Sequence, residues 1–456
     1  MTFKDAEDGA AWSLPVAKET GLKGEVSLPG DKSISHRCVL LGAIAKGETT
    51  ITGLLEGEDV LRSAACMRAL GAEIECDIDQ GGAKTWRVFN GPINAGHEDR
   101  DANSTLYFGN AGTGVRLAMG LVAGLKIEAG FDGDESLRGR PMGRILEPLS
   151  KMGLVAMSNE GRLPVQFEGA NHLNAIRYRL PVPSAQIKSA ILLAGLGAKG
   201  TTIIEEPLRS RDHTENMLKS FGAKIEVEPF EEEGRLISLA GEQSLSGTHI
   251  NVPGDPSSAA FPIAGALITP SSDILVRNVL MNEMRIGVLT TFQEMGGQIE
   301  ILAPRNEGGE PVADIRVRAS ELYGVEIPAS RAPAMIDEYP IVSIVSAFAK
   351  GETLMAGIGE MRIKESDRIA AMEEGLIANG VKVESGPDWM KVTGSGEPVH
   401  GGGLAKTYHD HRIAMSFLVM GMASKAKIGV DELSMIATSF PNFVELMNAL
   451  GARIDG

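Results

Sequence analysis

Residues 28–37 read Leu-Pro-Gly-Asp-Lys-Ser-Ile-Ser-His-Arg and bring a lysine, two serine hydroxyls and an arginine close together. The turn residues Pro29-Gly30-Asp31, followed by an apolar run that reaches Ala45, predict the end of a strand, a tight turn and the start of a buried helix. A helix start carries unpaired N–H groups and partial positive charge, so this stretch could bind a phosphate or a carboxylate. A plain capped helix with solvated charges is the alternative.

Similar combinations recur along the chain, and most also have an ordinary structural explanation. A Gly-rich turn, a helix cap or a solvated helix face would account for them one at a time. The two histidines at 409 and 411 could be metal ligands, but no third ligand cluster is evident. The stretches are 109–116 (GNAGTGVR), 182–189 (VPSAQIKS), 209–214 (RSRDHT), 362–368 (RIKESDR) and 408–412 (YHDHR). Taken together, basic residues at so many helix starts predict a common cleft that binds anions, and no metal centre.

The overall charge makes this basic clustering informative. The chain has 456 residues and a net charge of −16, which argues against a nucleic-acid or anionic-membrane partner. Cys38, Cys66 and Cys76 form no metal-like pair and suit a reducing compartment. No signal peptide or membrane-spanning run is evident, so we expect a soluble, cytoplasmic protein. We also expect a monomer.

A repeated pattern predicts the elements that position these residues. A short amphipathic helix that ends in Gly, followed by a strand, occurs around Gly71, Gly153, Gly222, Gly296, Gly380 and Gly451. Each Gly fits a helix C-cap that needs a positive φ. With a second helix and strand upstream, each unit reads as strand–helix–strand–helix–strand, which predicts an α/β fold of six units.

The six units divide into two groups of three. Pro29-Gly30-Asp31 recurs as Pro253-Gly254-Asp255, each time after a strand-like run. These two points predict chain crossings between two domains of similar size, joined as hinged rigid bodies.

With these stretches identified, the chain resembles the 5-enolpyruvylshikimate-3-phosphate synthase family, in its class II branch. The motifs that carry the resemblance are LPGDKSISHR (28–37), GNAGTGVR (109–116), RPMGRILEPL (140–149), VPSAQIKSA (182–190), RDHTE (211–215), DEYP (337–340), RIKESDR (362–368) and HDHRIAMSF (409–417). The resemblance implies an inside-out α/β barrel pair of six βαβαββ-type units. It assigns residues 1–30 with 254–456 to one domain and 31–253 to the other, with hinges near Asp31 and Gly254.

The resemblance also implies a reaction that needs no cofactor or metal. The family transfers the enolpyruvyl group of phosphoenolpyruvate to the 5-hydroxyl of shikimate 3-phosphate and releases phosphate, in the pathway to chorismate and the aromatic amino acids. Addition and elimination require proton transfer to the methylene carbon and from the hydroxyl. The motifs assign Glu365 as the acid, Asp337 as the base and Lys32 as a contact to both substrates.

The remaining assignments concern substrate binding. Shikimate 3-phosphate would be held by Lys32, Ser33, Arg37, Ser184, Gln186, Arg211, Asp337 and Lys364. Phosphoenolpyruvate would be held by Lys32, Gly112, Arg140, Gln186, Arg368 and Arg412, since guanidinium groups bind carboxylate and phosphate in a bidentate manner.

Two positions depart from many relatives. Thr438 stands where many members have a lysine, so that contact is lost or supplied elsewhere. Gly112 stands where some class II members have alanine, whose methyl group crowds the inhibitor glyphosate more than phosphoenolpyruvate. We therefore expect glyphosate to inhibit this protein relative to the alanine-bearing members.

Two other functions remain possible. The first is enolpyruvyl transfer to UDP-N-acetylglucosamine, but the loop cysteine of that family has no counterpart here, because the last cysteine is Cys76. The second is a catalytically inactive anion-binding protein on the same scaffold. The joint presence of Lys32, Asp337 and Glu365 with the arginine set argues against it.

Overall fold

The described strands of this protein form six separate four-stranded sheets. The structure is a computed structural model, and it describes residues 10–89, 105–168 and 172–455. Within these ranges every sheet has four strands, and helices alternate with strands along the chain. The predicted α/β class and the sixfold repeat are confirmed. The sheets close no continuous hydrogen-bonded barrel among the described strands.

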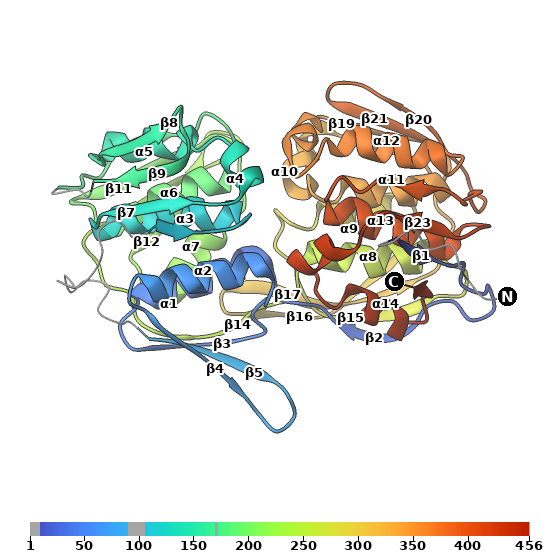
Figure 1. Cartoon of the computed structure of the whole chain (residues 1–456), viewed down its shortest axis with the longest axis horizontal. Coiled ribbons are helices and arrows are strands. Elements are labelled where there is room, and N and C mark those ends of the chain that lie inside the picture. Colours follow the sequence, from blue (N-terminus) through green and yellow to red (C-terminus); the bar gives the residue numbers. More distant parts are fainter. Residues whose placement is uncertain (1–9, 90–104, 169–171, 456) are drawn as a thin grey trace. The chain divides into compact units, whose positions relative to one another are not determined.

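The chain divides into two compact units. Unit 1 comprises Met1–Pro29, Pro253–Arg305 and Pro311–Gly456, and unit 2 comprises Gly30–Val252 with Asn306–Glu310. Unit 2 therefore includes a five-residue segment from much later in the chain. Figure 1 shows each unit in the colours of the sequence.

Unit 2 contains three sheets of one design. In each, a short strand lies parallel to the strand that follows a buried helix, and two antiparallel strands complete the sheet. The orders are β14 (His249–Asn251), β3 (Glu48–Thr52), β5 (Lys84–Phe89), β4 (Glu73–Ile78); β6 (Thr105–Tyr107), β7 (Ala129–Asp132), β9 (Arg162–Phe167), β8 (Ala156–Asn159); and β10 (Arg177–Arg179), β11 (Thr201–Glu206), β13 (Gly234–Ala240), β12 (Ile225–Phe230). The last strand of the unit thus completes the first sheet.

Unit 1 repeats the design with the N-terminal residues included. The orders are β2 (Lys23–Ser27), β15 (Asp273–Leu280), β17 (Glu310–Arg318), β16 (Gln298–Glu307); β18 (Glu326–Ile327), β19 (Lys350–Ala356), β21 (Trp389–Ser395), β20 (Lys382–Ser385); and β22 (Leu404–Ala405), β23 (Ile428–Val430), β1 (Ala11–Ser13), β24 (Ile454–Asp455). β1 pairs with β23 and β24, and β2 runs parallel to β15. The described part of the N-terminus is therefore built into this unit, whereas residues 1–9 lie outside the described residues.

The helices supply the core of each unit. Unit 2 contains α1 (Lys32–Ile44), α2 (Glu58–Ala69), α3 (Gly112–Leu125), α4 (Glu135–Gly139), α5 (Gly143–Met152), α6 (Ala185–Gly195) and α7 (His213–Ser220). Unit 1 contains α8 (Pro256–Ile268), α9 (Gly287–Glu294), α10 (Ala332–Met335), α11 (Tyr339–Phe348), α12 (Arg368–Ala378), α13 (His411–Ala423), α14 (Phe443–Ala449) and the 3₁₀ helices Ala329–Arg331, Gly359–Ile363 and Ser434–Thr438.

One helix of each repeat is buried along most of its length. These helices are α1, α3 and α6 in unit 2 and α8, α11 and α13 in unit 1. Glycine allows close packing at the contact between α3 and α6, because a Cβ on Gly120 would lie 2.3 Å from the Ala190 carbonyl oxygen. Burial of the whole helix fixes the position of its first residues, where the candidate site residues lie.

The repeated glycines have the predicted backbone conformation. Gly71, Gly153, Gly222, Gly296, Gly380 and Gly451 all have φ between +81° and +108°. Gly153 is itself the C-cap of α5, whereas each of the other five glycines directly follows the C-cap residue of its helix. The predicted positive φ at the helix ends is therefore confirmed, with five of the glycines one residue beyond the cap.

None of the described helices combines the length and the apolar character that crossing a bilayer requires.

Candidate active site

The start of α1 has the predicted capped geometry. The Asp31 carboxylate accepts a hydrogen bond from the Ile34 N–H at 2.8 Å. Lys32, the first residue of the helix, places Nζ 3.2 Å from Oδ2 of Asp59. The cap fixes the first turn, and the lysine is held by one carboxylate while it stays partly exposed.

Arg37 is buried and donates hydrogen bonds to two hydroxyl groups and one carbonyl group. Its Nε donates to Thr214 Oγ1 at 2.7 Å, and its two terminal nitrogens donate to the Ser33 carbonyl and to Ser189 Oγ, each at 2.8 Å. Burial lowers the pKa of Arg37 to about 10, against the opposing effect of nearby carboxylates such as Glu215. The side chain therefore stays charged at neutral pH and ties α1 to α6 and α7.

Three arginines gather near the start of α3. Burial, followed by the positive charges of Arg144 and Arg140, lowers the pKa of Arg116 to about 9. Arg140 donates to Asn110 Oδ1 and to Ser136 Oγ. Because like charges repel one another in this partly buried place, a bound anion would stabilise the group.

Gly112, the first residue of α3, lies against this arginine group. A Cβ on Gly112 would lie 2.9 Å from Nη1 of Arg140 and 3.5 Å from Nη1 of Arg116. The missing side chain therefore leaves room for the guanidinium groups beside the helix start.

The start of α6 is tied to the same group. Ser184 caps α6, with Oγ 3.4 Å from the Ile187 N–H. Gln186 accepts from Arg116 Nη1 at 2.9 Å and donates to Thr113 Oγ1 at 3.1 Å. Gln186, Gly112 and Arg140 are thus brought together around Arg116, which the sequence analysis did not single out. The arginine at the end of the GNAGTGVR motif was the available signal.

Lys188, four residues after the Ser184 cap, points inward instead. Its Nζ lies 2.9 Å from Glu206 and 2.8 Å from Glu215, and all three side chains are buried. Burial alone would lower the pKa of this lysine, but the two carboxylates outweigh it and raise the pKa. The lysine therefore has a structural role inside unit 2.

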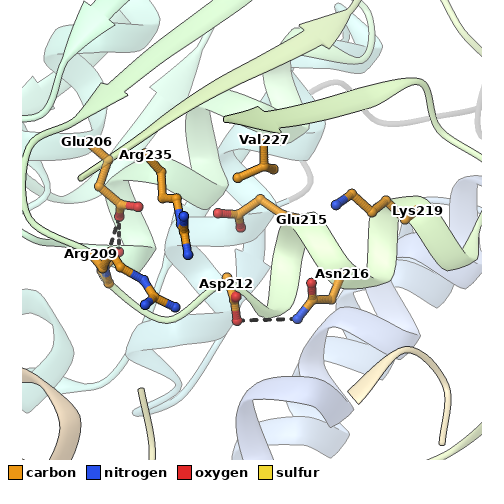
Figure 2. A pocket seen from close by; sticks show the side chains of 9 residues that line it. Glu206, Arg209, Asp212, Glu215, Asn216, Lys219, Val227 and Arg235 are labelled. Atoms are coloured by element: carbon orange, nitrogen blue, oxygen red, sulfur yellow. Dashed lines mark hydrogen bonds between the residues drawn. The ribbon is translucent and has the colours of Figure 1, made fainter. Parts of the chain in front are cut away.

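A polar pocket of about 260 Å³ lies next to this cluster, between α7 and the strands β12 and β13 (Figure 2). Its lining residues are Glu206, Arg209, Ser210, Asp212, Glu215, Asn216, Lys219, Val227 and Arg235. Three basic side chains face three carboxylates, so the pocket has no excess positive charge to select an anion.

The start of α7 is held by a segment distant in sequence. His213 Nδ1 lies 2.9 Å from Glu310 Oε1, and Asn216 Nδ2 donates to the same oxygen at 3.3 Å. Asp212 lies within ligand distance of this pair, so the three side chains have the composition of a metal site. The two donors on Glu310 explain the cluster as a hydrogen-bonded anchor for the helix that follows Arg211.

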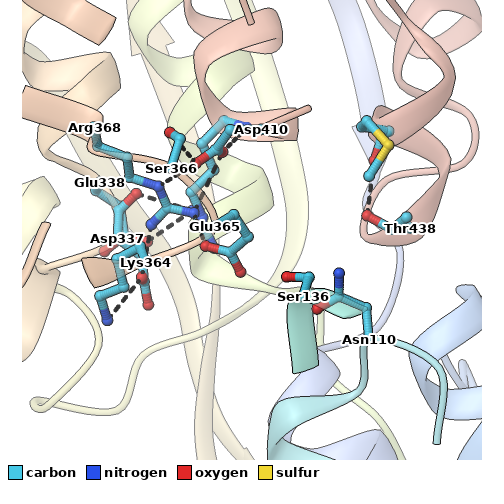
Figure 3. A network of polar contacts seen from close by, with 12 residues as sticks. Asn110, Ser136, Asp337, Glu338, Lys364, Glu365, Ser366, Arg368, Asp410 and Thr438 are labelled. Atoms are coloured by element: carbon cyan, nitrogen blue, oxygen red, sulfur yellow. Dashed lines mark hydrogen bonds and ion pairs between the residues drawn. The ribbon is translucent and has the colours of Figure 1, made fainter. Parts of the chain in front are cut away.

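In unit 1, a single buried guanidinium gathers the candidate carboxylates (Figure 3). Arg368, the first residue of α12, is 1% exposed and contacts three acidic side chains. Its nitrogens lie 2.8 Å from Asp410, 2.6 Å from Glu365 and 3.2 Å from Asp337. The structure therefore brings together Asp337, Glu365 and Arg368, which the sequence analysis took from two separate motifs.

The charges in this group stabilise one another. Burial alone would lower the pKa of Arg368, but Asp410, Glu365 and Asp337 together raise it well above its usual value. Burial alone would raise the pKa of Asp410, but Arg368 outweighs it and lowers the pKa. The guanidinium and the Asp410 carboxylate are therefore both charged at neutral pH.

Asp410 is the residue that sequence reasoning missed here. Its carboxylate is fully buried and accepts from Arg368, from Ser366 Oγ at 3.1 Å and from the backbone N–H of Arg412 at 2.9 Å. It thus caps α13 and orients the buried arginine. The motif HDHR contained the signal, but His409 is 78% exposed and pairs with Glu432, so the two histidines do not act as a metal pair with Asp410.

Asp337 receives two further contacts. Lys364 Nζ lies 3.5 Å from its Oδ1, and Arg412 Nη1 donates to its backbone oxygen at 3.1 Å. The RIKESDR stretch is therefore not a solvated helix face, since α12 begins only at Arg368, and Lys364 and Arg368 both contact Asp337.

Thr438 offers no cation in place of the lysine that many relatives have. Its hydroxyl donates to the Met435 carbonyl at 2.7 Å, within the 3₁₀ helix Ser434–Thr438.

The chemistry that each unit offers is complementary. Unit 2 carries helix starts with Lys32 and the Arg116–Arg140–Arg144 group, which suit phosphate or carboxylate. Unit 1 carries two carboxylates on a fixed guanidinium, which suit proton transfer beside an anion. These features define a class of α/β protein that binds small anionic molecules and can move protons on them.

Comparison with known proteins specifies the class. The family model described as EPSP synthase (3-phosphoshikimate 1-carboxyvinyltransferase) matches residues 16–447. A protein from Parvibaculum lavamentivorans named 3-phosphoshikimate 1-carboxyvinyltransferase is 55% identical over 98% of both chains, and one of the same name from Methylorubrum extorquens is 54% identical over 97% of both. A solved structure of EPSP synthase from Acinetobacter baumannii has a TM-score of 0.85 and 40% identity, covering 98% of this chain and 100% of that chain. The chain belongs to the EPSP synthase family.

Proposed function

We propose that this protein transfers the enolpyruvyl group of phosphoenolpyruvate to the 5-hydroxyl of shikimate 3-phosphate, releasing phosphate. The observation that carries the proposal is the pair of carboxylates, Asp337 and Glu365, held on the buried Arg368 guanidinium in a chain that belongs to this family. One carboxylate can take a proton while the other gives one, and the arginine can hold substrate charge between these steps.

In the addition step, Asp337 takes the proton of the 5-hydroxyl as its oxygen attacks the second carbon of phosphoenolpyruvate, and Glu365 donates a proton to the methylene carbon. The methylene becomes a methyl group in a tetrahedral intermediate. In the elimination step, the Glu365 carboxylate takes a proton from the methyl group, the double bond re-forms, and the C–O bond to phosphate breaks as the leaving phosphate takes up the proton held by Asp337. Lys32 contacts both substrates in this scheme. No metal or organic cofactor enters either step.

Phosphoenolpyruvate binding is assigned to guanidinium groups and a helix start. Arg140, Arg368 and Arg412 would hold its carboxylate and phosphate, with Lys32, Gln186 and the Gly112 backbone. The support is the gathering of Arg140 and Gln186 around Arg116 in unit 2, and the contacts of the Arg368 and Arg412 guanidinium groups to Asp337 in unit 1.

Shikimate 3-phosphate binding is assigned to polar groups at helix starts. The residues are Lys32, Ser33, Arg37, Ser184, Gln186, Arg211, Asp337 and Lys364. Arg37 donates to the Ser33 carbonyl, Ser184 caps α6, and Arg211 precedes Asp212, the N-cap residue of the anchored helix α7.

We also propose the domain arrangement, with residues 1–30 and 254–456 in one domain, 31–253 in the other and hinges near Asp31 and Gly254. The compact units support it, with boundaries at Pro29 and Pro253, and so does the hydrogen bond from the Asp255 N–H to the Pro29 oxygen at 3.1 Å. This bond joins the two segments within unit 1. We further propose that the protein is a monomer, that it is cytoplasmic and that glyphosate inhibits it.

A phosphate-release assay with purified protein, phosphoenolpyruvate and shikimate 3-phosphate tests the proposed function. Release with shikimate 3-phosphate is expected. Release only with UDP-N-acetylglucosamine would identify the other enolpyruvyl transfer, and release with neither acceptor would identify an anion-binding protein. Glu365→Gln should lower kcat by about 10²- to 10⁴-fold and leave substrate binding by calorimetry intact, because the amide keeps the shape and loses the proton.

A further inference from the structure

A buried network of polar side chains contacts Arg412 in unit 1. Its members are Glu338, Ser257, Arg285 and Asp255, and none is more than 6% exposed. They come from the residue before α11, the first turn of α8, the segment before α9 and the α8 cap. Four side chains from distant parts of the sequence thus meet behind one arginine.

The hydrogen bonds of this network run from Arg285 through Ser257 to Glu338. Arg285 Nη2 donates to Ser257 Oγ at 3.1 Å, and the Ser257 hydroxyl donates to Glu338 Oε1. The same carboxylate oxygen lies 3.4 Å from Arg412 Nη1. Each hydrogen bond polarises the next, so the positive charge of Arg285 strengthens the hydrogen bond from Ser257 to Glu338.

Asp255 binds Arg285, at the end of the network away from Arg412. It accepts from Arg285 Nη2 and from the Ser257 N–H, each at 2.8 Å, and so caps α8. Two guanidiniums therefore match two buried carboxylates, which removes most of the cost of burying the charges. The arrangement holds Glu338 in one position.

Glu338 in turn restricts Arg412. Within the described residues, Arg412 contacts protein side chains and carbonyls through Nη1, which reaches both the Asp337 oxygen at 3.1 Å and Glu338. These two contacts restrict the rotation of the guanidinium. A planar fork binds a carboxylate or phosphate well only when its plane is correctly oriented.

We propose that Glu338 is a positioning residue for Arg412, held in place by Ser257 and Arg285. The inference rests on the proposed role of Arg412 in phosphoenolpyruvate binding. Glu338 acts through the arginine and needs no contact with substrate. Its loss should therefore weaken phosphoenolpyruvate binding selectively and leave shikimate 3-phosphate binding unchanged.

The test compares steady-state constants for Glu338→Gln, Glu338→Asp and Ser257→Ala, with Ser346→Ala as the matched control. Ser346 is also a buried serine of unit 1, but its hydroxyl donates to the Val342 carbonyl of its own helix. For Glu338→Gln we expect KM for phosphoenolpyruvate to rise about tenfold, with KM for shikimate 3-phosphate within twofold. Glu338→Asp, which keeps the charge, should fall between wild type and Glu338→Gln. Ser257→Ala should shift the same constant about threefold, and Ser346→Ala should shift neither.

Arg412→Lys separates the inference from the function beneath it. If Arg412→Lys leaves KM for phosphoenolpyruvate unchanged, the proposed role of Arg412 fails. The positioning role fails if Arg412→Lys raises KM for phosphoenolpyruvate but Glu338→Gln and Ser257→Ala do not. It also fails if Glu338→Gln and Ser257→Ala raise KM for phosphoenolpyruvate and KM for shikimate 3-phosphate equally. In the Arg412→Lys background, Glu338→Gln should add less than twofold, because residues that act through one another are not additive. Should Glu338→Gln fail to fold, Ser257→Ala decides by the same criteria.

Discussion

Gly112→Ala is the change whose consequence the structure defines most closely. The new Cβ would lie 2.9 Å from Nη1 of Arg140, 3.5 Å from Nη1 of Arg116 and 3.7 Å from Cδ1 of Leu137. The last two are ordinary contacts, but the first is too short. The Arg140 guanidinium must therefore move outward by roughly 0.5–1 Å to reach normal van der Waals separation.

The backbone itself tolerates the substitution. Gly112 begins α3 and is not among the glycines with positive φ. Alanine is favoured over glycine in helices by about 1 kcal/mol, so Tm should stay the same or rise. The effect should thus appear in ligand binding, because the methyl group and the displaced guanidinium both change the space beside the helix start.

The assay is glyphosate inhibition of phosphate release at fixed phosphoenolpyruvate. We expect the inhibition constant to rise at least tenfold in Gly112→Ala, equivalent to about 1.4 kcal/mol of binding free energy. KM for phosphoenolpyruvate should rise by a smaller factor if, as we propose, the methyl group crowds the inhibitor more than the substrate. Gly143→Ala is the matched control, because Gly143 begins α5 and a Cβ there meets nothing within 4 Å. Unchanged inhibition in Gly112→Ala, or an equal rise in Gly143→Ala, would refute the reasoning.

Two further changes test other parts of unit 2. Glu310→Gln weakens the anchor on His213, so KM for shikimate 3-phosphate should rise a few-fold in kinetic assays while KM for phosphoenolpyruvate stays constant; equal effects on both would contradict this. Burial lowers the pKa of His36 to about 4, so below pH 6.5 the unfolded chain binds more protons than the folded one and stability falls as the pH falls toward 4. The free energy of unfolding can be measured by urea titration at pH 6.5 and at pH 4. Between these pH values it should fall by on the order of 3 kcal/mol less in His36→Gln, whose amide can still reach Ser63, than in wild type. An identical pH dependence in the two proteins would exclude the histidine as the cause.

The repeat and its helix ends could be predicted because they depend on local sequence. A glycine after an amphipathic helix needs no distant partner to end it, and all six such glycines have the predicted positive φ. Asp31 and Asp255 follow the same rule, since each caps the helix that begins beside it. The α/β class followed from the order of these local elements.

The candidate site was predictable as a set of motifs, but not as a set of contacts. Arg116 and Asp410 lay inside recognised motifs, yet nothing local indicated that one meets Gln186 and the other holds Arg368. Lys188, in a motif that resembles the family site, points instead to Glu206 and Glu215. Which side of a helix start a side chain faces depends on how the whole helix is packed.

The sequence by itself determined the helix caps, the sixfold α/β pattern and the chemical types available at the helix starts. Only the tertiary structure decided that Glu310 anchors α7 from 97 residues away, and that Ser257 and Arg285 hold Glu338 behind Arg412. The physical reason is that caps and turns are satisfied by neighbours in the chain, whereas a buried charge must find its partners in space. Those partners are fixed by the packing of many helices and sheets at once.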